Sequence, residues 1–429
     1  MDKVYIISGL LSFLSFPLIA QKSDYQAQYR EKVLEYNQDL KAAGYNEAMK
    51  QEMIKSARAD FKPKLSAGGN FNYTGNPLEL SIDLPSMSSP LYFQGKDLKY
   101  GATLSLSQPI YTGGGLRANY QKAKQEKELA SNESNRIKSN TLHDADIYYW
   151  NAVAQHELVF VAQAFRTSIQ QLVEVEYIDR NDLLMAEVKL NDADFQLLQT
   201  RDNAEIARLA LNSFAGVNPS DTLPIDHSVI ALKQFIPLSD EIDNAITSRP
   251  EYRIAQNKIE LQESSRKIAD ARFLPQFHIG VDGSYSSPGY NFKSNLDPNY
   301  AIYAKFSIPL FEWGKRKSTR NASSYAINMA QQNLSKAQDK IRLEIQTAHY
   351  NYKQAIDKVK LTESSLSKAS ESEQMAMERY KEGNVSIVEV INAQLYHQQA
   401  QVNYIQSKLN AQMAKTDFER AIYYLREKE

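Results

Sequence analysis

Four segments of the chain alternate apolar and polar residues with a period of two. The alternation covers residues 65–74 and 98–108, and it recurs over 277–286 and 299–308. A period of two places every second side chain on one side of a β-strand, so the pattern predicts four strands. Each is about 9–11 residues long, which is the length of a tilted strand that crosses a lipid bilayer. An ordinary half-buried sheet is the alternative, but the rest of the chain offers little to cover one.

The rest of the chain is predicted to be helical, with two very long helices. Residues 116–176 and 315–382 contain neither proline nor glycine, and a helix over the second run would extend about 100 Å. Its apolar residues recur at spacings of three, four and seven, as in packed coiled-coil helices. Many of them are alanine, which allows close approach but gives a thin apolar seam. We therefore expect an oligomer.

Shorter helices are predicted beside the long ones. They cover about 181–214 and 241–273 and are joined by a linker. Their summed length matches one long helix, so two of them stacked end to end can line it. Residues 25–60 and 386–425 can play the same part in the other half of the chain.

The two halves of the chain repeat one pattern at changing offsets. The aligned pairs are Pro63 with Pro275 at an offset of 212, Pro109 with Pro309 at 200, and residues 182–187 with 389–394 at 207. The first change in the offset between the two halves falls in a loop rich in proline and serine. The second equals one heptad, the insertion length that keeps a coiled-coil face in register. The chain is therefore interpreted as an internal duplication.

A division into domains follows from the duplication. Residues 1–20 hold a lysine and then an apolar run, and they are expected to be a secretory signal cleaved near Ala20. A membrane anchor is the alternative. We expect a first repeat over 21–215, a linker over 216–240 and a second repeat over 241–429.

Composition excludes several classes of protein. The 50 basic residues are balanced by 51 acidic ones, so the basic excess of a nucleic-acid-binding protein is missing. The chain has no cysteine, which rules out disulfides and thiol catalysis. The six histidines lack metal-ligand spacing, and the sequence has no P-loop, nucleophile elbow or dinucleotide fingerprint. We expect no enzymatic activity, no cofactor and no bound metal.

The predicted strands also imply an assembly. Four antiparallel strands leave two unpaired edges, which a membrane does not tolerate. Three copies would supply twelve strands, enough for a closed barrel with a water-filled lumen. The helices would then continue from the foot of the barrel as a sheath.

In the order and spacing of its parts, the sequence resembles the TolC-like outer-membrane factors. The parts are a signal segment, a duplicated helix–strand–strand–helix unit, a strand-ending proline followed by glycine, Arg-Pro-Glu at 249–251, and a turn with Tyr380, Gly383 and Ser386. The resemblance implies a mainly α fold with a membrane β part, in which a duplicated coiled-coil tunnel carries four strands per chain. It also implies a homotrimer that closes a 12-stranded barrel in the outer membrane of a Gram-negative bacterium, with a periplasmic helical domain.

The same resemblance implies a function. Such proteins are the exit channels of tripartite efflux pumps and type I secretion systems. Their partners are a periplasmic adaptor, an inner-membrane transporter and outer-membrane lipid. A periplasmic coiled-coil scaffold or adaptor without a pore is the alternative, although it would not explain four strands of bilayer length. The cargo is not encoded in any motif.

The two turns farthest from the strands would contact the adaptor, by the same resemblance. The residues assigned to this contact are Glu176, Tyr177, Ile178, Asp179, Gly383, Asn384, Val385 and Ser386. Gly383 is predicted to end the long helix in a left-handed conformation, and Ser386 with Glu389 to form a capping box for the next helix. Asp179 is the expected N-cap in the first turn. Glu176 stands where the family generally has glycine, so that turn is expected to differ.

Three residues near the turns are assigned to a periplasmic aperture by the resemblance: Asp182, Tyr380 and Glu389. Asp182 and Glu389 are equivalent in the two repeats, so a trimer would place six carboxylates around one opening. In the family, acidic residues here narrow the entrance and favour cations. Capping is the alternative for both acids, because a carboxylate in the first turn is favoured by the helix dipole in any protein.

Six residues are assigned to corners between the strands and the long helices. They are Pro63, Pro109, Gly114, Pro275, Pro309 and Gly314. Pro109 and Pro309 are predicted to end the strand ladders, because proline cannot donate to them. The glycines at 113–115 could suggest phosphate binding, but the lysine and hydroxyl of a P-loop are missing, which favours a turn.

Overall fold

The computed structural model describes residues 24–86, 88–174, 180–232, 242–289 and 295–423. The expected signal segment, 1–20, lies outside the described residues. In chain order the elements are α1 (Tyr25–Tyr36), α2 (Gln38–Ala59), β1 (Lys64–Tyr73), β2 (Glu79–Ile82), β3 (Leu91–Gln94), β4 (Leu98–Thr112), α3 (Gly115–Val173), α4 (Arg180–Phe214), α5 (Ile242–Ser248), α6 (Pro250–Ala271), β5 (Gln276–Ser287), β6 (Asp297–Ser307), α7 (Lys315–Lys381) and α8 (Ile387–Ala421).

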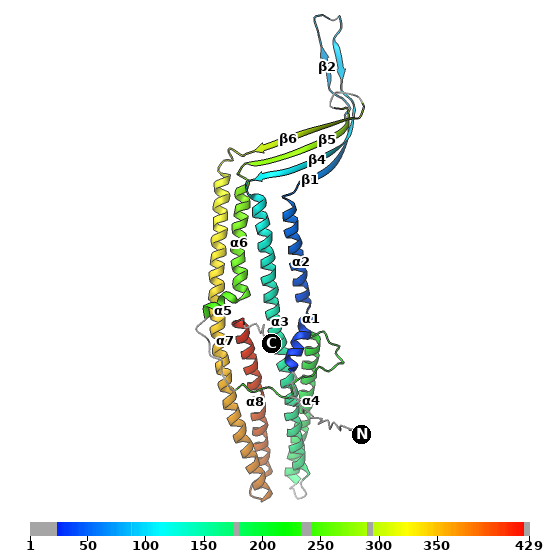
Figure 1. Ribbon diagram of the computed structural model, residues 1–429. Coiled ribbons are helices and arrows are strands. Elements are labelled where there is room, and N and C mark those ends of the chain that lie inside the picture. Colours follow the sequence, from blue (N-terminus) through cyan, green and yellow to red (C-terminus); the bar gives the residue numbers. More distant parts are fainter. Residues whose placement is uncertain (1–23, 87, 175–179, 233–241, 290–294, 424–429) are drawn as a thin grey trace, which may run out of the picture.

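The helices form a long column with a four-stranded sheet at one end and two hairpin tips at the other (Figure 1). The long helix α3 packs on α2 and α6 in the half near the sheet, and on α4 and α8 in the other half. The second long helix, α7, packs on α6 and α8. Shorter helices thus line the long ones end to end, as expected from their lengths, although within the chain α2 lies on α3 rather than on α7. Over the described ranges, no helix is long and apolar enough to cross a membrane.

The segment predicted as one helix over 241–273 is two helices, α5 and α6, which part at Arg249. Pro250 is the first residue of α6. Proline begins a helix readily because its missing N–H is not needed there, but inside a helix its ring clashes with the preceding turn. A similar break separates α1 from α2, where the Asn37 side chain caps the second helix by accepting from the Leu40 N–H at 2.9 Å.

The two halves of the chain contain matching elements. Helices α2 and α6 both have 22 residues and start 212 positions apart, and α4 and α8 both have 35 residues and start 207 positions apart. Helices α3 and α7 start 200 positions apart. These offsets equal those of the sequence alignment, so residues of the two halves can be equated position by position.

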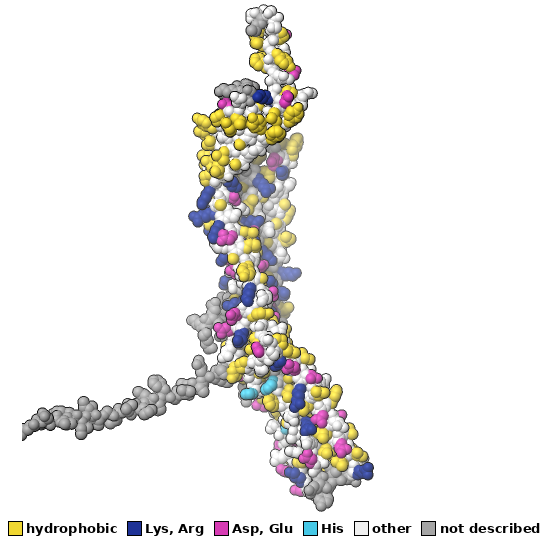
Figure 2. Space-filling view, turned by 90° about the vertical axis from the view of Figure 1, so that its right-hand side faces the viewer, with side chains coloured by type: hydrophobic (Ala, Val, Ile, Leu, Met, Phe, Trp, Pro, Cys, Tyr) yellow, Lys and Arg dark blue, Asp and Glu magenta, His cyan; other side chains and the backbone are white. Residues whose placement is uncertain are grey.

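The sheet has one apolar and one polar face. Its strands are antiparallel in the order β1-β4-β5-β6, and all four predicted strands are confirmed. The register aligns Leu65, Leu106, Val281 and Ile302 in one row, and Ser66, Ser105, Asp282 and Ala301 in the next. Neighbouring rows point to opposite faces. Figure 2 shows the band of hydrophobic side chains at the level of the sheet.

A second, two-stranded sheet extends beyond the first, away from the helices (Figure 1). It pairs β2 with β3, with Leu80 opposite Phe93 and Ile82 opposite Leu91. The sequence pattern predicts a loop for this segment, and the structure shows a short hairpin instead. Its strands have only four residues each, which is too short for a period of two to stand out among the flanking prolines and serines.

The prediction that Pro109 ends its strand is wrong. Strand β4 continues to Thr112, and its register with β5 shifts between Pro109 and Tyr111. Strand β1 pairs with β4 only as far as Ser107, so at Pro109 one side of β4 has no neighbour within the chain. Proline is tolerated at such an open edge and at a bulge, because the donor that it lacks is not needed there. Pro309 does follow the end of β6 at Ser307.

The glycine corners differ in how much space they leave. Gly114 and Gly314 precede α3 and α7 with φ of 82° and 80°, and an added Cβ at either would meet no atom. At Gly113, with φ of 61°, an added Cβ would lie 2.6 Å from the Ala271 carbonyl oxygen. The end of α6 therefore packs directly against the backbone of this corner.

We expect Gly113→Ala to be more damaging than Gly114→Ala. Both substitutions force a left-handed backbone on alanine, at a cost of about 1–2 kcal/mol. Only Gly113→Ala must also displace the end of α6. The midpoint of thermal unfolding of the purified protein should fall for both variants and fall further for Gly113→Ala. Equal midpoints would contradict the proposed close packing.

Candidate functional site

The α7–α8 tip is a turn closed by backbone hydrogen bonds. Gly383 has a φ of 74°, the left-handed conformation that the sequence predicts. Its N–H donates to the Tyr380 carbonyl at 2.9 Å, and the Asn384 N–H donates to the Arg379 carbonyl at 2.9 Å. This pair of bonds is the Schellman motif, which satisfies the last free carbonyls of a helix.

The capping box predicted for Ser386 and Glu389 does not form. Ser386 occupies the N-cap position of α8, but its side chain makes no capping hydrogen bond, and the Glu389 side chain is exposed. Instead Val385 and Val390, on either side of the N-cap, pack into one apolar cluster. An apolar contact between these two positions fixes the start of a helix without a side-chain cap.

That apolar cluster joins the two hairpins at their tips. It includes Ile169 and Leu172 at the end of α3, Ala186 on α4, and Ile387 on α8, all with side chains at most 2 % exposed. Because residues from both hairpins fill one cluster, the two tips are positioned relative to each other. The other half of the predicted contact surface, residues 176–179, lies outside the described residues.

Two of the three predicted aperture residues are near enough to interact electrostatically. Asp182 is in the first turn of α4 and Tyr380 in the last turn of α7. Burial, and then the Asp182 carboxylate, raise the pKa of the Tyr380 hydroxyl above its usual value. Glu389 lies in the first turn of α8 at the same end of the column. It is exposed and has no resolved contact with the other two.

The corner residues lie at the opposite end of the helices. Pro63 and Pro275 immediately precede β1 and β5. Trp313, which was not among the predicted site residues, has a left-handed backbone (φ 45°) and a side chain that is 90 % exposed. Its ring packs edge-on against the Phe311 ring, with 4.9 Å between the two ring centroids. An exposed aromatic pair beside a corner glycine is a signal that could have been read from the sequence, since such rings favour a membrane–water interface.

A buried arginine joins three helices near the middle of the column. The Arg249 side chain is 4 % exposed. Its Nη1 donates to the carbonyl oxygens of Arg420 and Ala421 at 2.9 and 3.0 Å, at the end of α8. Its Nε donates to Glu251 at 2.9 Å and its Nη2 to Glu344 of α7 at 3.3 Å. The guanidinium of Arg249 thus donates to four acceptors from α6, α7 and α8.

Polar pairs also join α3 to α8. His143 contacts Asp417 with 2.6 Å between Nε2 and Oδ1, and Lys408 donates to Glu157 at 2.6 Å. The Glu157 carboxylate also accepts from the Val229 N–H at 2.8 Å, which ties in the segment after α4. These charged groups are paired across helices, which is the expected arrangement for structural rather than catalytic side chains.

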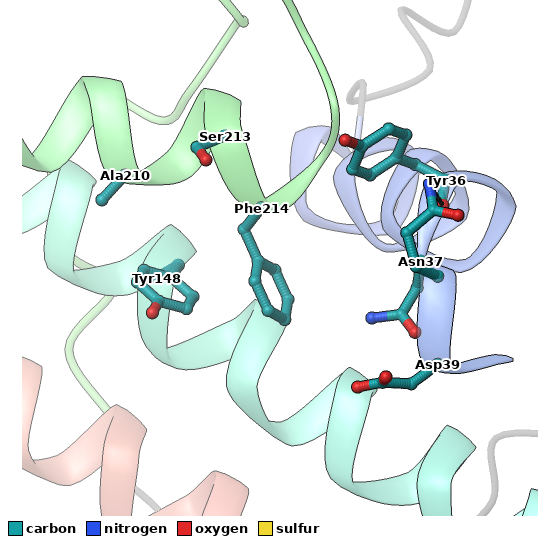
Figure 3. Close-up of a pocket in the computed structure, with 8 residues that line it drawn as sticks. Tyr36, Asn37, Asp39, Tyr148, Ala210, Ser213 and Phe214 are labelled. Carbon is teal, nitrogen blue, oxygen red and sulfur yellow. Dashed lines mark hydrogen bonds between the residues drawn. The ribbon is translucent and has the colours of Figure 1, made fainter. Parts of the chain in front are cut away.

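An open cleft of about 460 Å³ lies where α1 and α4 end (Figure 3). Figure 3 shows Phe214 between Tyr148 on one side and Asn37 and Asp39 on the other, and the Tyr148 and Phe214 rings are 4.8 Å apart. The lining residues are Tyr36, Asn37, Gln38, Asp39, Tyr148, Ala210, Ser213 and Phe214. Within the described ranges, no group of three or more histidine, cysteine or acidic side chains is arranged to hold a metal ion.

Comparison with known proteins gives one family and one fold. The sequence matches the family model described as "Outer membrane efflux protein" over residues 30–217 and 242–422. No curated protein sequence matches the chain significantly.

Three solved structures illustrate the similarity of fold. The chain is 19 % identical to the outer membrane channel CmeC of Campylobacter jejuni, covering 93 % of this chain and 85 % of that one with a TM-score of 0.76. For the open state of the MtrE outer membrane channel of Neisseria gonorrhoeae, the identity is 17 %, the coverage 93 % and 88 %, and the TM-score 0.76. For the outer membrane protein VceC of Vibrio cholerae, the identity is 16 %, the coverage 92 % and 95 %, and the TM-score 0.75.

Proposed function

Because the chain belongs to the outer membrane efflux protein family, and is thus an efflux channel of the bacterial outer membrane with a periplasmic helical domain, we propose that it serves as the passive exit duct of a tripartite efflux pump or type I secretion system. Cargo would enter from an inner-membrane transporter through a periplasmic adaptor. Members of this family are not enzymes. Family membership also decides against the poreless scaffold.

The sheet is the observation that carries the proposal. One face is mainly apolar and largely exposed, with Leu65 and Ile302 at 66 % and 76 % exposure. Within the part of the chain that the structure describes, the outer edges of β1 and β6 are unpaired. Both features disfavour a lone chain in a membrane. If three sheets pair edge to edge, all strands are hydrogen-bonded, lipid contacts the apolar face, and the polar face lines a twelve-stranded barrel.

The helices carry matching signs of a trimer. The family forms trimers in efflux pumps, and the described helices that pack on α7 are α5, α6 and α8. A stripe of exposed apolar residues, spaced by 14, 7 and 11 positions, follows α7: Met329, Leu343, Tyr350 and Leu361. A second stripe, spaced by 4, 7 and 11, follows α4: Leu184, Val188, Phe195 and Ile206. Such spacings keep residues on one side of a helix, so the stripes can pack together between protomers.

The tips would be the adaptor and entrance end of the duct. The Gly383–Ser386 turn and the turn at residues 176–179 would contact the adaptor. Asp182, Tyr380 and Glu389 would surround the entrance, and the electrostatic effect of Asp182 on the Tyr380 hydroxyl within one chain supports this arrangement. The duplicated units would be residues 21–215 and 241–429, joined by the linker 216–240 and preceded by a signal at 1–20.

Removing both proposed entrance carboxylates tests the duct and its aperture. In planar bilayers, Asp182→Asn combined with Glu389→Asn should raise single-channel conductance and weaken cation preference, because six negative charges leave the narrowest part of the path. Glu52→Gln is the control, since this exposed acid of α2 lies far from the tips. Absence of channels in the wild type would refute the duct. Unchanged conductance and selectivity in the double variant would refute the aperture alone.

A further inference from the structure

The cleft near Asn37 occupies the place in the first repeat that the Arg249 side chain fills in the second. Helices α2 and α6 are 212 positions apart, so Asn37 corresponds to Arg249 and Asp39 to Glu251. Both Asn37 and Arg249 are N-caps of their helices. The correspondence therefore relates an arginine with four acceptors around it to an asparagine beside an open cleft.

The ends of α4 and α8 have the same backbone geometry, which extends the correspondence to the carbonyl groups. The Gly216 N–H donates to the Ser213 carbonyl at 3.2 Å, and the equivalent Tyr423 N–H donates to the Arg420 carbonyl at 3.0 Å. Gly216 and Tyr423 both have a left-handed φ, of 66° and 51°. Hence the carbonyl groups of Ser213 and of the next residue of α4 correspond to the two carbonyl groups of α8 that bind Arg249.

In the first repeat no cation among the described residues fills this position. Asn37 is short, and its oxygen accepts from the Leu40 N–H. Asp39 is exposed, and among the described residues no cation lies within ion-pair distance of it. Lys41 lies over the Tyr36 ring at 5.7 Å but does not line the cleft. A carboxylate and the carbonyl end of a helix together favour a positive charge.

The contact of α3 with α8 indicates what a neighbouring protomer would place there. Helices α3 and α7 are equivalent, and α8 is equivalent to α4, so a trimer should repeat the α3–α8 contact as α7 against α4 of the next protomer. Asn140 of α3 accepts from Arg420 at 3.4 Å. The equivalent pair is Lys340 of α7 and Ser213 of α4. In the α3–α8 contact the cationic side chain is on α8, whereas in the α7–α4 contact it is on α7.

A second pair supports the same placement. His143 contacts Asp417 between α3 and α8, and the equivalent residues are Leu343 and Ala210. Leu343 is 65 % exposed in the chain, and Ala210 lines the cleft. An apolar pair thus replaces a polar one. Lys340 and Leu343 are about one helical turn apart and lie on the same side of α7. If Leu343 packs on the cleft wall, Lys340 therefore lies beside the cleft.

We propose that the cleft is a cation socket completed by a second copy of the chain, with Lys340 of a neighbouring protomer bound by Asp39 and by the carbonyl end of α4. This inference rests on the proposed trimer. Its chemistry is that of the Arg249 site, except that the cation is supplied between chains. Lys340 is exposed and has no ion-pair partner among the described residues of its own chain.

Disulfide trapping tests the socket directly, because the chain has no cysteine. Oxidised Lys340→Cys, Ser213→Cys protein should run as covalent dimers and trimers on denaturing gels. Asp339→Cys with Ser213→Cys is the matched control, since residue 339 lies about 100° around the helix. Trimer formation is followed separately by migration of unheated samples. Intact trimers without the 340–213 disulfide, or with equal trapping from 339, would overturn the socket. A wild type without trimers would overturn the proposed assembly instead.

A charge-replacement experiment keeps the proposal testable if the cysteine pair assembles poorly. Lys340→Met should lower the temperature at which the trimer dissociates by several degrees. Adding Asn37→Arg should restore it, because the new guanidinium can reach the α4 carbonyls within one chain as Arg249 does in α8. Because Asn37→Arg also removes the N-cap of α2, the double variant is compared with Asn37→Arg alone. A wild-type dissociation temperature for Lys340→Met, or an equal loss from Lys340→Met in the wild type and in Asn37→Arg, would overturn the proposal.

Discussion

Replacing Val281 by lysine will remove the protein from the outer membrane, whereas lysine at the adjacent Asp282 will leave it there. Val281 is at the middle of β5 and lies between Leu106 and Ile302 on the apolar face. A lysine facing lipid at mid-depth in a barrel costs about 2–4 kcal/mol in each chain. Summed over the three chains of a trimer, the cost is roughly 6–12 kcal/mol, which is comparable to the whole stability of many proteins.

The control in this experiment differs by one position only. Asp282 is in the next row, on the polar face, where the proposed barrel holds water. The amount of heat-sensitive trimer in the outer-membrane fraction measures the outcome. Equal loss from Val281→Lys and Asp282→Lys, or equal tolerance of both, would show that the apolar face does not contact lipid.

Replacing Arg249 by methionine will destabilise the helical column by about 3–5 kcal/mol, the usual result of removing one partner of a buried ion pair. The two carbonyls at the end of α8 would lose their donor, and Glu344 would keep only its contact with Arg420, at 3.1 Å. Lysine should rescue this loss poorly, because a single ammonium group cannot reach four separate acceptors.

Arg342→Met is the matched comparison for Arg249→Met. Arg342 also pairs with an acid, Asp243 at 3.2 Å, but both side chains are largely exposed. An exposed ion pair contributes about 0–1 kcal/mol. Denaturant unfolding of the two variants should therefore separate them clearly. Similar midpoints would mean that water reaches the Arg249 site and replaces its hydrogen bonds.

The strands and long helices were predictable because each carries its own periodic signal. All four membrane strands and both long helices agree with the alternation and with the runs free of proline and glycine. The break before Pro250 was also readable in principle, since proline begins helices more readily than it continues them. The continuation of β4 past Pro109 was not, because it depends on where the neighbouring strand β1 stops.

The site was less predictable than the fold for the same physical reason. Gly383 needs only local information, because its φ is set by the end of its own helix. The start of α8 depends instead on Val385 and Val390 reaching an apolar cluster with α3 and α4. The cleft at Asn37 combines side chains from α1, α2, α3 and α4, so no single stretch of sequence could reveal it.

The unbroken length of α7 also fixes the distance between the sheet and the hairpin tips. Its 67 residues rise about 1.5 Å each, so the tip stands about 100 Å from the strands. Exposed Trp313 and Phe311, at the start of this helix, are suited to the membrane interface. The tip would thus stand at a set depth in the cell envelope. A rigid rod cannot stretch when the spacing between the two membranes changes, so any such change must be taken up by the partner that meets it.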